Sequence, residues 1–171
     1  SDNSAATPYP STINVAGFSG TIAKATVTLH NVNHSWSDDI DIILVGPGGQ
    51  STYLMSDAGG QGNELVNVTL AFDDDAADTL PDSTQIVAGT YRPTNYGTGD
   101  TFPGPAPGAP YGASLGTFDG TNPNGDWSLY VVDDANDDSG TIAGGWELQL
   151  NTSNSPPQAD PQVIGVNKGS T

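Results

Sequence analysis

Eleven of the 18 aspartates of this chain fall into four groups, and each group lies at the end of a predicted strand or in the turn beside it. The groups are Asp38, Asp39 and Asp41; Asp57; Asp73, Asp74 and Asp75; and Asp133, Asp134, Asp137 and Asp138. Two carboxylates about 6 Å apart repel by roughly 0.7 kcal/mol even in water, and by more where solvent is excluded. Packing several such groups together therefore requires a cation.

Calcium is the cation that fits these ligand types. It takes six to eight oxygens from carboxylates, amides, backbone carbonyls and water in a loose geometry, whereas magnesium requires a stricter octahedron. Zinc normally uses histidine or cysteine, and the chain has two histidines and no cysteine. We therefore expect calcium ions as cofactor and partner. The alternative for any single aspartate is a solvated turn, which Asp favours through hydrogen bonds to its own backbone.

Alternation along a strand expected at residues 39–47 places Asp39 and Asp41 on one face, so these two are the pair expected to ligate together. Asp57 ends the next strand, and a hairpin would return it beside the first. Asp133 and Asp138 could complete this site or form a second one, and Asp38 could equally be a bystander. The candidate metal ligands are Asp39, Asp41, Asp57, Asp133, Asp138, Asp38, Asp134 and Asn136.

The segment "DDANDDSG" places Asp134, Asn136 and Asp138 at alternate positions, which is the spacing with which EF-hand loops wrap calcium. Ser139 stands where the EF-hand glycine belongs, and neither flanking helices nor a distal glutamate follows. The segment is therefore not an EF-hand.

Catalytic signals are weak. The two histidines, His30 and His34, lie four residues apart on one predicted strand, about 13 Å from each other, and cannot share a metal. Neither a metalloprotease "HExxH" nor a hydrolase "GxSxG" is present. A glycosidase cleft is usually lined with aromatic side chains, and the chain has three tryptophans. We expect a chain that is not an enzyme.

The charge balance excludes polyanionic partners. Three basic residues, Lys24, Arg92 and Lys168, stand against 20 acidic ones, for a formal charge of -17. Nucleic acid and anionic membrane surfaces need clusters of Lys and Arg, so we expect neither as a partner. No apolar run spans a bilayer, and the first residues lack the layout of a signal peptide. We expect a monomeric module from a secreted or cell-surface protein.

Short β-branched segments bounded by Gly, Pro, Asn and Asp predict an all-β, antiparallel sandwich of eight or nine strands. The predicted strands are residues 11–17, 21–34, 39–47, 51–57, 64–73, 83–93, 112–120, 126–134 and 140–152. Alternation predicts a core made of Ile40, Ile42, Leu44, Trp127, Leu129, Val131, Val27, Leu29, Trp146, Leu148 and Leu150.

Two segments do not read as strands. Residues 94–110 are rich in Gly and Pro, and predict either a long ordered loop over the sandwich or a mobile insertion. After Asn151 the paired prolines indicate a linker. We therefore expect one domain at residues 1–152, followed at residues 153–171 by a linker and the start of another module or a tail.

Two separated blocks resemble the proprotein convertase P domain. The first is "HSWSDDIDIILVGPGG", with His34, Trp36 and Asp39 before a strand that ends in a glycine turn. The second is "GDWSLYVVDDANDDSGTIAGGWELQL", which matches at Gly125, Trp127, Leu129, Val131, Asp133, Asp138, Gly140, Trp146, Leu148 and Leu150. Gly46 replaces the usual Ser, and a Pro/Gly-rich segment, "FPGPAPGAPYGASLGTF", replaces the Trp-containing middle of the family.

The resemblance covers roughly residues 8–152 and implies a jelly-roll-like sandwich, similar to galactose-binding domains, that binds calcium in some members. It also implies a detached bacterial module rather than one tied to a protease, because the replaced middle belongs to the part associated with the protease. Three functions stay open: a structural, stabilising or adhesive calcium-binding module; the C-terminal P domain of a secreted subtilisin-like protease; and a carbohydrate-binding module using Trp36, Tyr91, Tyr96 and Tyr111.

Overall fold

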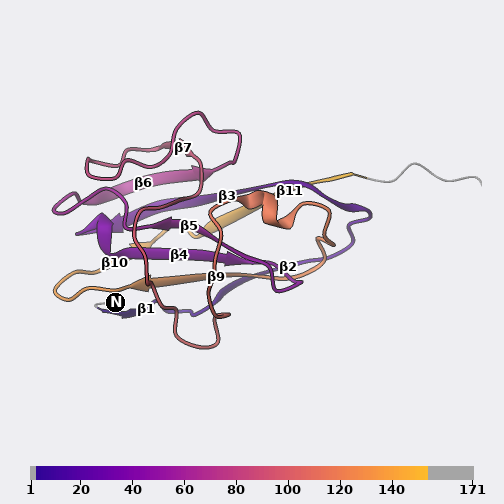
Figure 1. Cartoon of the computed structure of the whole chain (residues 1–171), viewed down its shortest axis with the longest axis horizontal. Helices are drawn as coiled ribbons and strands as arrows, with labels where there is room; N and C mark the ends of the chain where they lie inside the picture. Colours follow the sequence, from indigo (N-terminus) through magenta and orange to yellow (C-terminus); the bar gives the residue numbers. More distant parts are fainter. Residues whose placement is uncertain (1–2, 154–171) are drawn as a thin grey trace, which may run out of the picture.

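The computed structural model describes residues 3–153 as an all-β sandwich in which two sheets pack face to face, as the sequence predicted (Figure 1). The strands are β1 (Ser4–Ala5), β2 (Ser11–Val15), β3 (Thr21–His34), β4 (Ile40–Val45), β5 (Ser51–Ser56), β6 (Leu65–Phe72), β7 (Gly89–Tyr91), β8 (Thr94–Asn95), β9 (Gly125–Asp133), β10 (Gly140–Ile142) and β11 (Trp146–Ser153). Two short 3-10 helices, η1 (Ser37–Asp39) and η2 (Leu115–Phe118), precede β4 and β9.

The two sheets are mixed rather than purely antiparallel. The first has the order β1-β9-β4-β5-β8, with β2 also pairing with β9. The second has the order β10-β3-β6-β7, with β11 also pairing with β3. The parallel pairs are β5 with β8 and β6 with β7, two contacts made by very short strands. The antiparallel prediction is therefore wrong at these two edges.

The main core lies between the sheets, and alternation predicted its members well. Ile42, Leu44 and Trp127 are fully buried, and Val27 and Leu29 face them from β3. Val131, Trp146, Leu148 and Leu150 are partly buried and pack against this cluster. A side chain of this size contributes roughly 1.5–3 kcal/mol when it is buried.

The other face of β4, which carries Asp41 and Ile43, is also buried. Residues 96–112, here called the covering loop, lie over this face. Ile43 packs there with Tyr53, Phe102, Tyr130 and Val132 in a second hydrophobic cluster. Of the two possibilities for the Pro/Gly-rich segment, the structure shows the loop packed on the sandwich. Its first two predicted residues, Thr94 and Asn95, form β8 instead.

Three strand predictions need correction. Residues 112–120 contain η2, because the Ser114 hydroxyl accepts a hydrogen bond from the Gly116 amide and begins a helical turn. Of residues 83–93, only Gly89–Tyr91 pair as a strand. The predicted strand 140–152 is two strands, β10 and β11, separated by a turn in which Gly145 has a φ of +74°, a backbone conformation that glycine adopts without strain.

The predicted domain boundary is close to the end of β11, which continues to Ser153. The rest of the predicted linker lies outside the described residues. Among residues 3–153, no helix is long and apolar enough to cross a membrane.

Replacing Leu44 by Ala should lower the free energy of unfolding by about 2–5 kcal/mol, because its side chain is fully buried in the main core. The matched change Val66→Ala, at a residue that is 69% exposed, should cost less than about 0.5 kcal/mol. Denaturant unfolding of both variants measures the difference. Similar losses in the two variants would contradict the placement of β4 in the core.

Candidate metal centre

Three aspartates from distant parts of the chain meet at one end of the first sheet. Each of Asp41, Asp57 and Asp100 contributes a carboxylate oxygen, and these oxygens all lie within 4.8 Å of one another. Calcium holds its ligand oxygens at 2.3–2.6 Å, so two ligands of one ion can be up to about 5 Å apart. The spacing is therefore that of oxygens able to share one calcium ion.

The β4–β5 hairpin brings Asp41 and Asp57 together, as the sequence predicted. Asp41 lies in β4, and the antiparallel register pairs Ile42 with Met55, so Asp57 directly after β5 returns beside Asp41. Asp57 has a φ of +51°, a left-handed conformation that Asp tolerates better than most residues. A Cβ at Gly97 would collide with the Asp57 carboxylate, so the covering loop can approach here only as glycine.

Asp100 lies in the covering loop, and sequence reasoning missed it. The Tyr53 hydroxyl donates a hydrogen bond to Asp100 Oδ2 at 3.1 Å, and Ser56 Oγ lies 3.0 Å from the same oxygen and 3.2 Å from Asp57 Oδ2. Two residues later, Phe102 anchors the loop by packing against Tyr53 and Tyr111. The one feature of the sequence that could have pointed to Asp100 is that it is the single acidic residue in a segment expected to cover the sandwich.

The cluster is electrostatically unfavourable without a cation. Burial, together with smaller contributions from the neighbouring carboxylates of Asp100, Asp134 and Asp57, raises the pKa of Asp41 to about 8. Burial and Asp100 also raise the pKa of Asp57. In the part of the chain that the structure describes, Lys24 pairs with Asp73 and Asp75, and no ion pair reaches the cluster. Among residues 3–153, no ion pair with a basic side chain offsets the charges of these carboxylates.

Asp39 does not share a strand face with Asp41, because it ends η1 instead of lying in β4. Burial raises the pKa of Asp39 to about 6, with further contributions first from Asp138 and then from Asp134 and Asp133. The expected ligand pair is therefore divided: Asp41 faces the cluster with Asp57 and Asp100, and Asp39 faces the β9–β10 connection. A metal-binding role for Asp39 stays a prediction.

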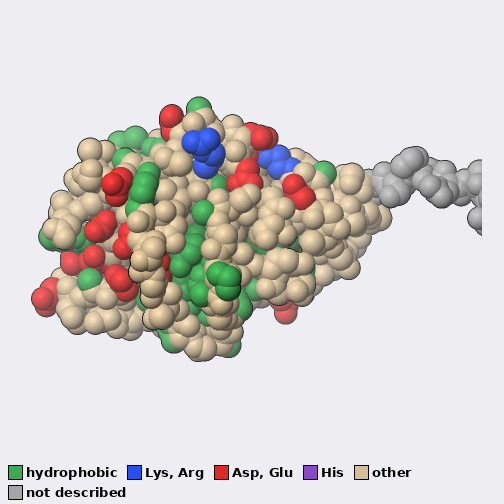
Figure 2. Space-filling model, in the orientation of Figure 1, with side chains coloured by type: hydrophobic (Ala, Val, Ile, Leu, Met, Phe, Trp, Pro, Cys, Tyr) green, Lys and Arg blue, Asp and Glu red, His purple; other side chains and the backbone are tan. Residues whose placement is uncertain are grey.

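Other predicted ligands have protein partners or lie at the edge of the cluster. Asp133 Oδ2 is 3.3 Å from His34 Nε2, Asp138 accepts a hydrogen bond from Ser35, and Asn136 accepts one from Asn3. Asp134 and Asp38 lie near enough to raise the pKa of Asp57. Acidic side chains gather at the end of the molecule where β9 turns into β10, at the left of Figure 2.

The group at residues 73–75 is satisfied within the protein. Asp73 and Asp75 form ion pairs with Lys24 at 2.8 and 2.7 Å. Asp74 accepts hydrogen bonds from the amides of Leu115 and Gly116 and from the Ser114 hydroxyl, and so caps η2. These contacts give this group a structural role.

Of the four aromatic residues considered for carbohydrate binding, Tyr91 and Tyr111 are used for packing, whereas Tyr96 is 42% exposed and Trp36 is half-buried. The Tyr111 ring packs against Tyr53 and Phe102 in the second cluster, and Tyr91 packs against the main core. The hydroxyls of Tyr91 and Tyr96 donate to the backbone carbonyls of Val87 and Leu80. These contacts match the packing role that is common for tyrosines at strand edges.

In calcium-depleted protein, stability should fall as the pH rises from about 4 to 8. The pKa of Asp41 is about 8 in the folded protein and 3.8 for the unperturbed group, so the folded state retains a proton that the unfolded chain releases. Thermal unfolding across this range measures the effect. The variant Asp41→Asn should show a shallower decline; an identical pH profile would contradict the burial of an ionisable group at this position.

Replacing Phe102 by Ala should cost about 3 kcal/mol of unfolding free energy and also weaken calcium binding, because Phe102 anchors the loop that carries Asp100. Denaturant unfolding and calorimetric calcium titration measure the two effects. Val87→Ala, at an exposed position, is the control. Loss of stability with an unchanged calcium affinity would show that the loop does not position Asp100 for the ion.

Comparison with known proteins found no matching family model and no match among curated proteins. Two solved structures match part of their length to this chain: the serine protease of Aeromonas sobria in complex with a chaperone, and a second structure of that protease. Each is 17% identical in sequence, with TM-scores of 0.37 and 0.38, over 91% and 89% of this chain. The chain spans 22% of the length of those chains.

Proposed function

We propose that this chain is a non-catalytic, calcium-binding β-sandwich module of a secreted or cell-surface protein, with a structural or adhesive role. The observation that carries the proposal is the meeting of Asp41, Asp57 and Asp100, from three separate segments, with no basic side chain among them. A carboxylate as buried as Asp41, which is 3% exposed, is costly when it is charged and unpaired. A divalent cation removes this cost.

The residues present fit calcium. The cluster offers carboxylate oxygens, with the Ser56 hydroxyl beside them, and no histidine or sulfur donor lies in it. The loop and strand ends can supply backbone carbonyls and admit water, as calcium coordination allows. An ion held here joins β4, the end of β5 and the covering loop.

Such a link would replace the disulfides that staple small extracellular domains, since the chain has no cysteine. A bound calcium ion would link two carboxylates of the hairpin to one of the loop directly, in addition to the contacts that Ser56 makes with Asp57 and Asp100. The module would then be stiff in calcium-rich extracellular fluid and looser without it.

The surroundings of the histidines support a non-catalytic role. His34 Nδ1 lies 2.6 Å from the Trp36 carbonyl, and Nε2 faces Asp133. His30 lies 3.5 Å from Glu147 at the surface. In the described part of the chain, no serine or threonine hydroxyl is hydrogen-bonded to either imidazole ring.

The second candidate function is the C-terminal P domain of a secreted subtilisin-like protease, where the module would support the folding of the enzyme. The two blocks that resemble this family form neighbouring strands, because β4 pairs with β9 along its whole length. The two departures from the family pattern also meet: a Cβ at Gly46 would lie 3.0 Å from the Phe118 ring of η2. Gly46 therefore leaves space for Phe118, which ends the Pro/Gly-rich segment that stands in place of the family's middle region.

The reading frame of the parent gene separates the two candidates. A catalytic domain with an Asp, His and Ser triad upstream of residue 1 would favour the protease-associated function. Further β-sandwich modules in its place would favour the structural or adhesive one.

Calcium should raise the melting temperature of the protein, and the chelator EGTA should reverse the increase. An ion at 100 times its dissociation constant contributes roughly 2.7 kcal/mol. Asp41→Asn and Asp100→Asn should abolish most of this increase, while leaving the calcium-free protein as stable as before or more stable, because each change removes a group whose charged form is repelled by its neighbours. Calorimetric calcium titration of the same variants should show the loss of binding.

Asp126→Asn is the matched control, because Asp126 lies at the opposite end of β9 from Asp133, about 23 Å away along the strand. It removes the same charge and should leave calcium binding nearly unchanged. Identical melting curves in calcium and EGTA would overturn the proposed function.

A further inference from the structure

Each sheet has an edge that is split into two short strands. On the first sheet, β1 pairs with Val132 and Asp133 of β9, whereas β2 pairs with residues 125–129. On the second sheet, β10 pairs with residues 32–34 of β3, whereas β11 pairs with residues 21–29. The chain leaves the first edge at residues 6–10 and the second at residues 143–145.

These two interruptions border the same cavity. Ala6, Thr7 and Pro8 from the first interruption and Gly145 from the second all line it. Its volume is about 390 Å³, which lies in the range of small-molecule binding sites. The sandwich is therefore open between its sheets at the place where neither edge has a continuous strand.

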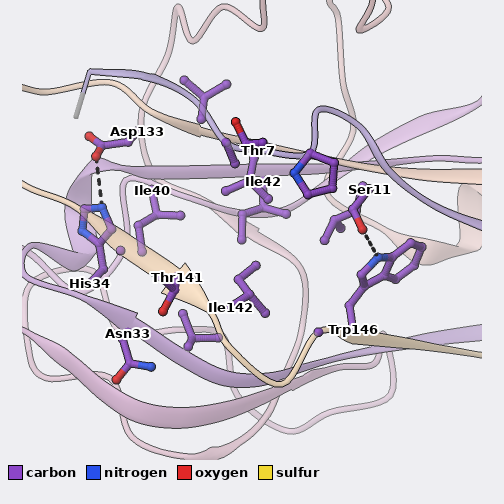
Figure 3. Close-up of a pocket in the computed structure, with 18 residues that line it drawn as sticks. Thr7, Ser11, Asn33, His34, Ile40, Ile42, Asp133, Thr141, Ile142 and Trp146 are labelled. Carbon is purple, nitrogen blue, oxygen red and sulfur yellow. Dashed lines mark hydrogen bonds and ion pairs between the residues drawn. The ribbon is translucent and has the colours of Figure 1, made fainter. Parts of the chain in front are cut away.

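The wall of the cavity is apolar and belongs to the main core. Figure 3 shows Ile40, Ile42 and Ile142 in its middle. The remaining apolar residues of the wall include Val32, Leu129 and Val131. A ligand with an apolar ring or short chain would gain roughly 25 cal/mol for each Å² of apolar surface that it buries here.

Polar groups lie at opposite sides of this wall. At one side, His34 and Asp133 form a buried pair, and each side chain is in a residue that is 6% exposed. At the other side, the Trp146 indole donates a hydrogen bond to the Ser11 hydroxyl at 3.0 Å (Figure 3). These four side chains bond to one another in pairs, and Asp133 is the one carboxylate among the residues that line the cavity.

The negative charge of the Asp133 carboxylate determines which ligands the cavity favours. A carboxylate accepts hydrogen bonds, so a ligand needs a hydroxyl or N–H group to pair with it. An anionic ligand would meet the Asp133 carboxylate and the negative field of a chain with a formal charge of -17. The pair and the apolar wall together favour an uncharged ring compound over an acid.

We propose that this cavity binds a small, uncharged, mostly apolar ring compound whose hydroxyl or N–H group pairs with Asp133 beside His34. The site is separate from the calcium cluster, because Asp133 lines the space between the sheets, whereas Asp134 raises the pKa of Asp41 on the other face of the first sheet. The binding function is additional to calcium binding and does not depend on it.

The test is a titration of the calcium-loaded protein with para-ethylphenol, followed by NMR of the isoleucine methyl groups. We expect saturable shifts at Ile40, Ile42 and Ile142 at about millimolar concentration, as is usual for a ligand of this size. The carboxylate analogue, para-ethylbenzoate, should bind about tenfold or more weakly. Absence of saturable shifts with the phenol, or equal affinity for the benzoate, would overturn the proposal.

Two variants test the location. Val131→Phe fills the cavity and should abolish phenol binding, whereas the matched change Val66→Phe, at a residue that does not line the cavity, should leave it unchanged. Thr7 lines the cavity from an exposed position, so Thr7→Trp should narrow the entrance of the cavity and weaken phenol binding. This variant tests the location of the ligand if Val131→Phe fails to fold. Unchanged phenol binding in Thr7→Trp and in folded Val131→Phe would place the ligand elsewhere and overturn the proposal.

Discussion

The burial of the Asp41 carboxylate is the constraint on which the functional end of this molecule depends. β4 is covered on both faces, by the main core on one side and by the second cluster on the other, and Asp41 lies on the second side with 3% exposure. Charge at such a position is stable only with a partner, and the nearest titratable groups are other carboxylates. The strand that organises the first sheet thus also buries an acidic side chain whose charged form is unfavourable there.

The covering loop links the acidic cluster of Asp41, Asp57 and Asp100 to the hydrophobic core. Phe102, which anchors the loop, and Asp100 are two residues apart. When Phe102 packs in the second cluster, it therefore places the Asp100 carboxylate beside Asp41 and Asp57. Packing favours the docked loop, and repulsion between Asp100 and Asp41 opposes it. The proposed calcium ion would reverse the sign of the second effect, and docking of the loop and binding of the ion would then reinforce each other.

The sequence predicted the parts of this arrangement that are local. Alternation identified the core positions of β4, and the hairpin placed Asp57 beside Asp41. Asp100 was not found, because a loop without periodicity carries no information about where it docks. Asp39 was assigned to a strand because a three-residue 3-10 turn is too short to leave a periodic pattern. Asp74 was grouped with possible ligands because its partners, the amides of η2, lie 40 residues away.

Adjacent aspartates at the end of β9 show why a run of acidic residues is a poor unit of interpretation. Successive strand residues point to opposite faces, so Asp133 turns inward to His34 while Asp134 follows on the side of the cluster of Asp41, Asp57 and Asp100. One peptide bond thus separates a carboxylate whose partner is a histidine from one that adds to the repulsion felt by Asp41. The role of each acidic residue is decided by what the opposite strand or loop places against it, and a count of charges along the sequence does not contain that information.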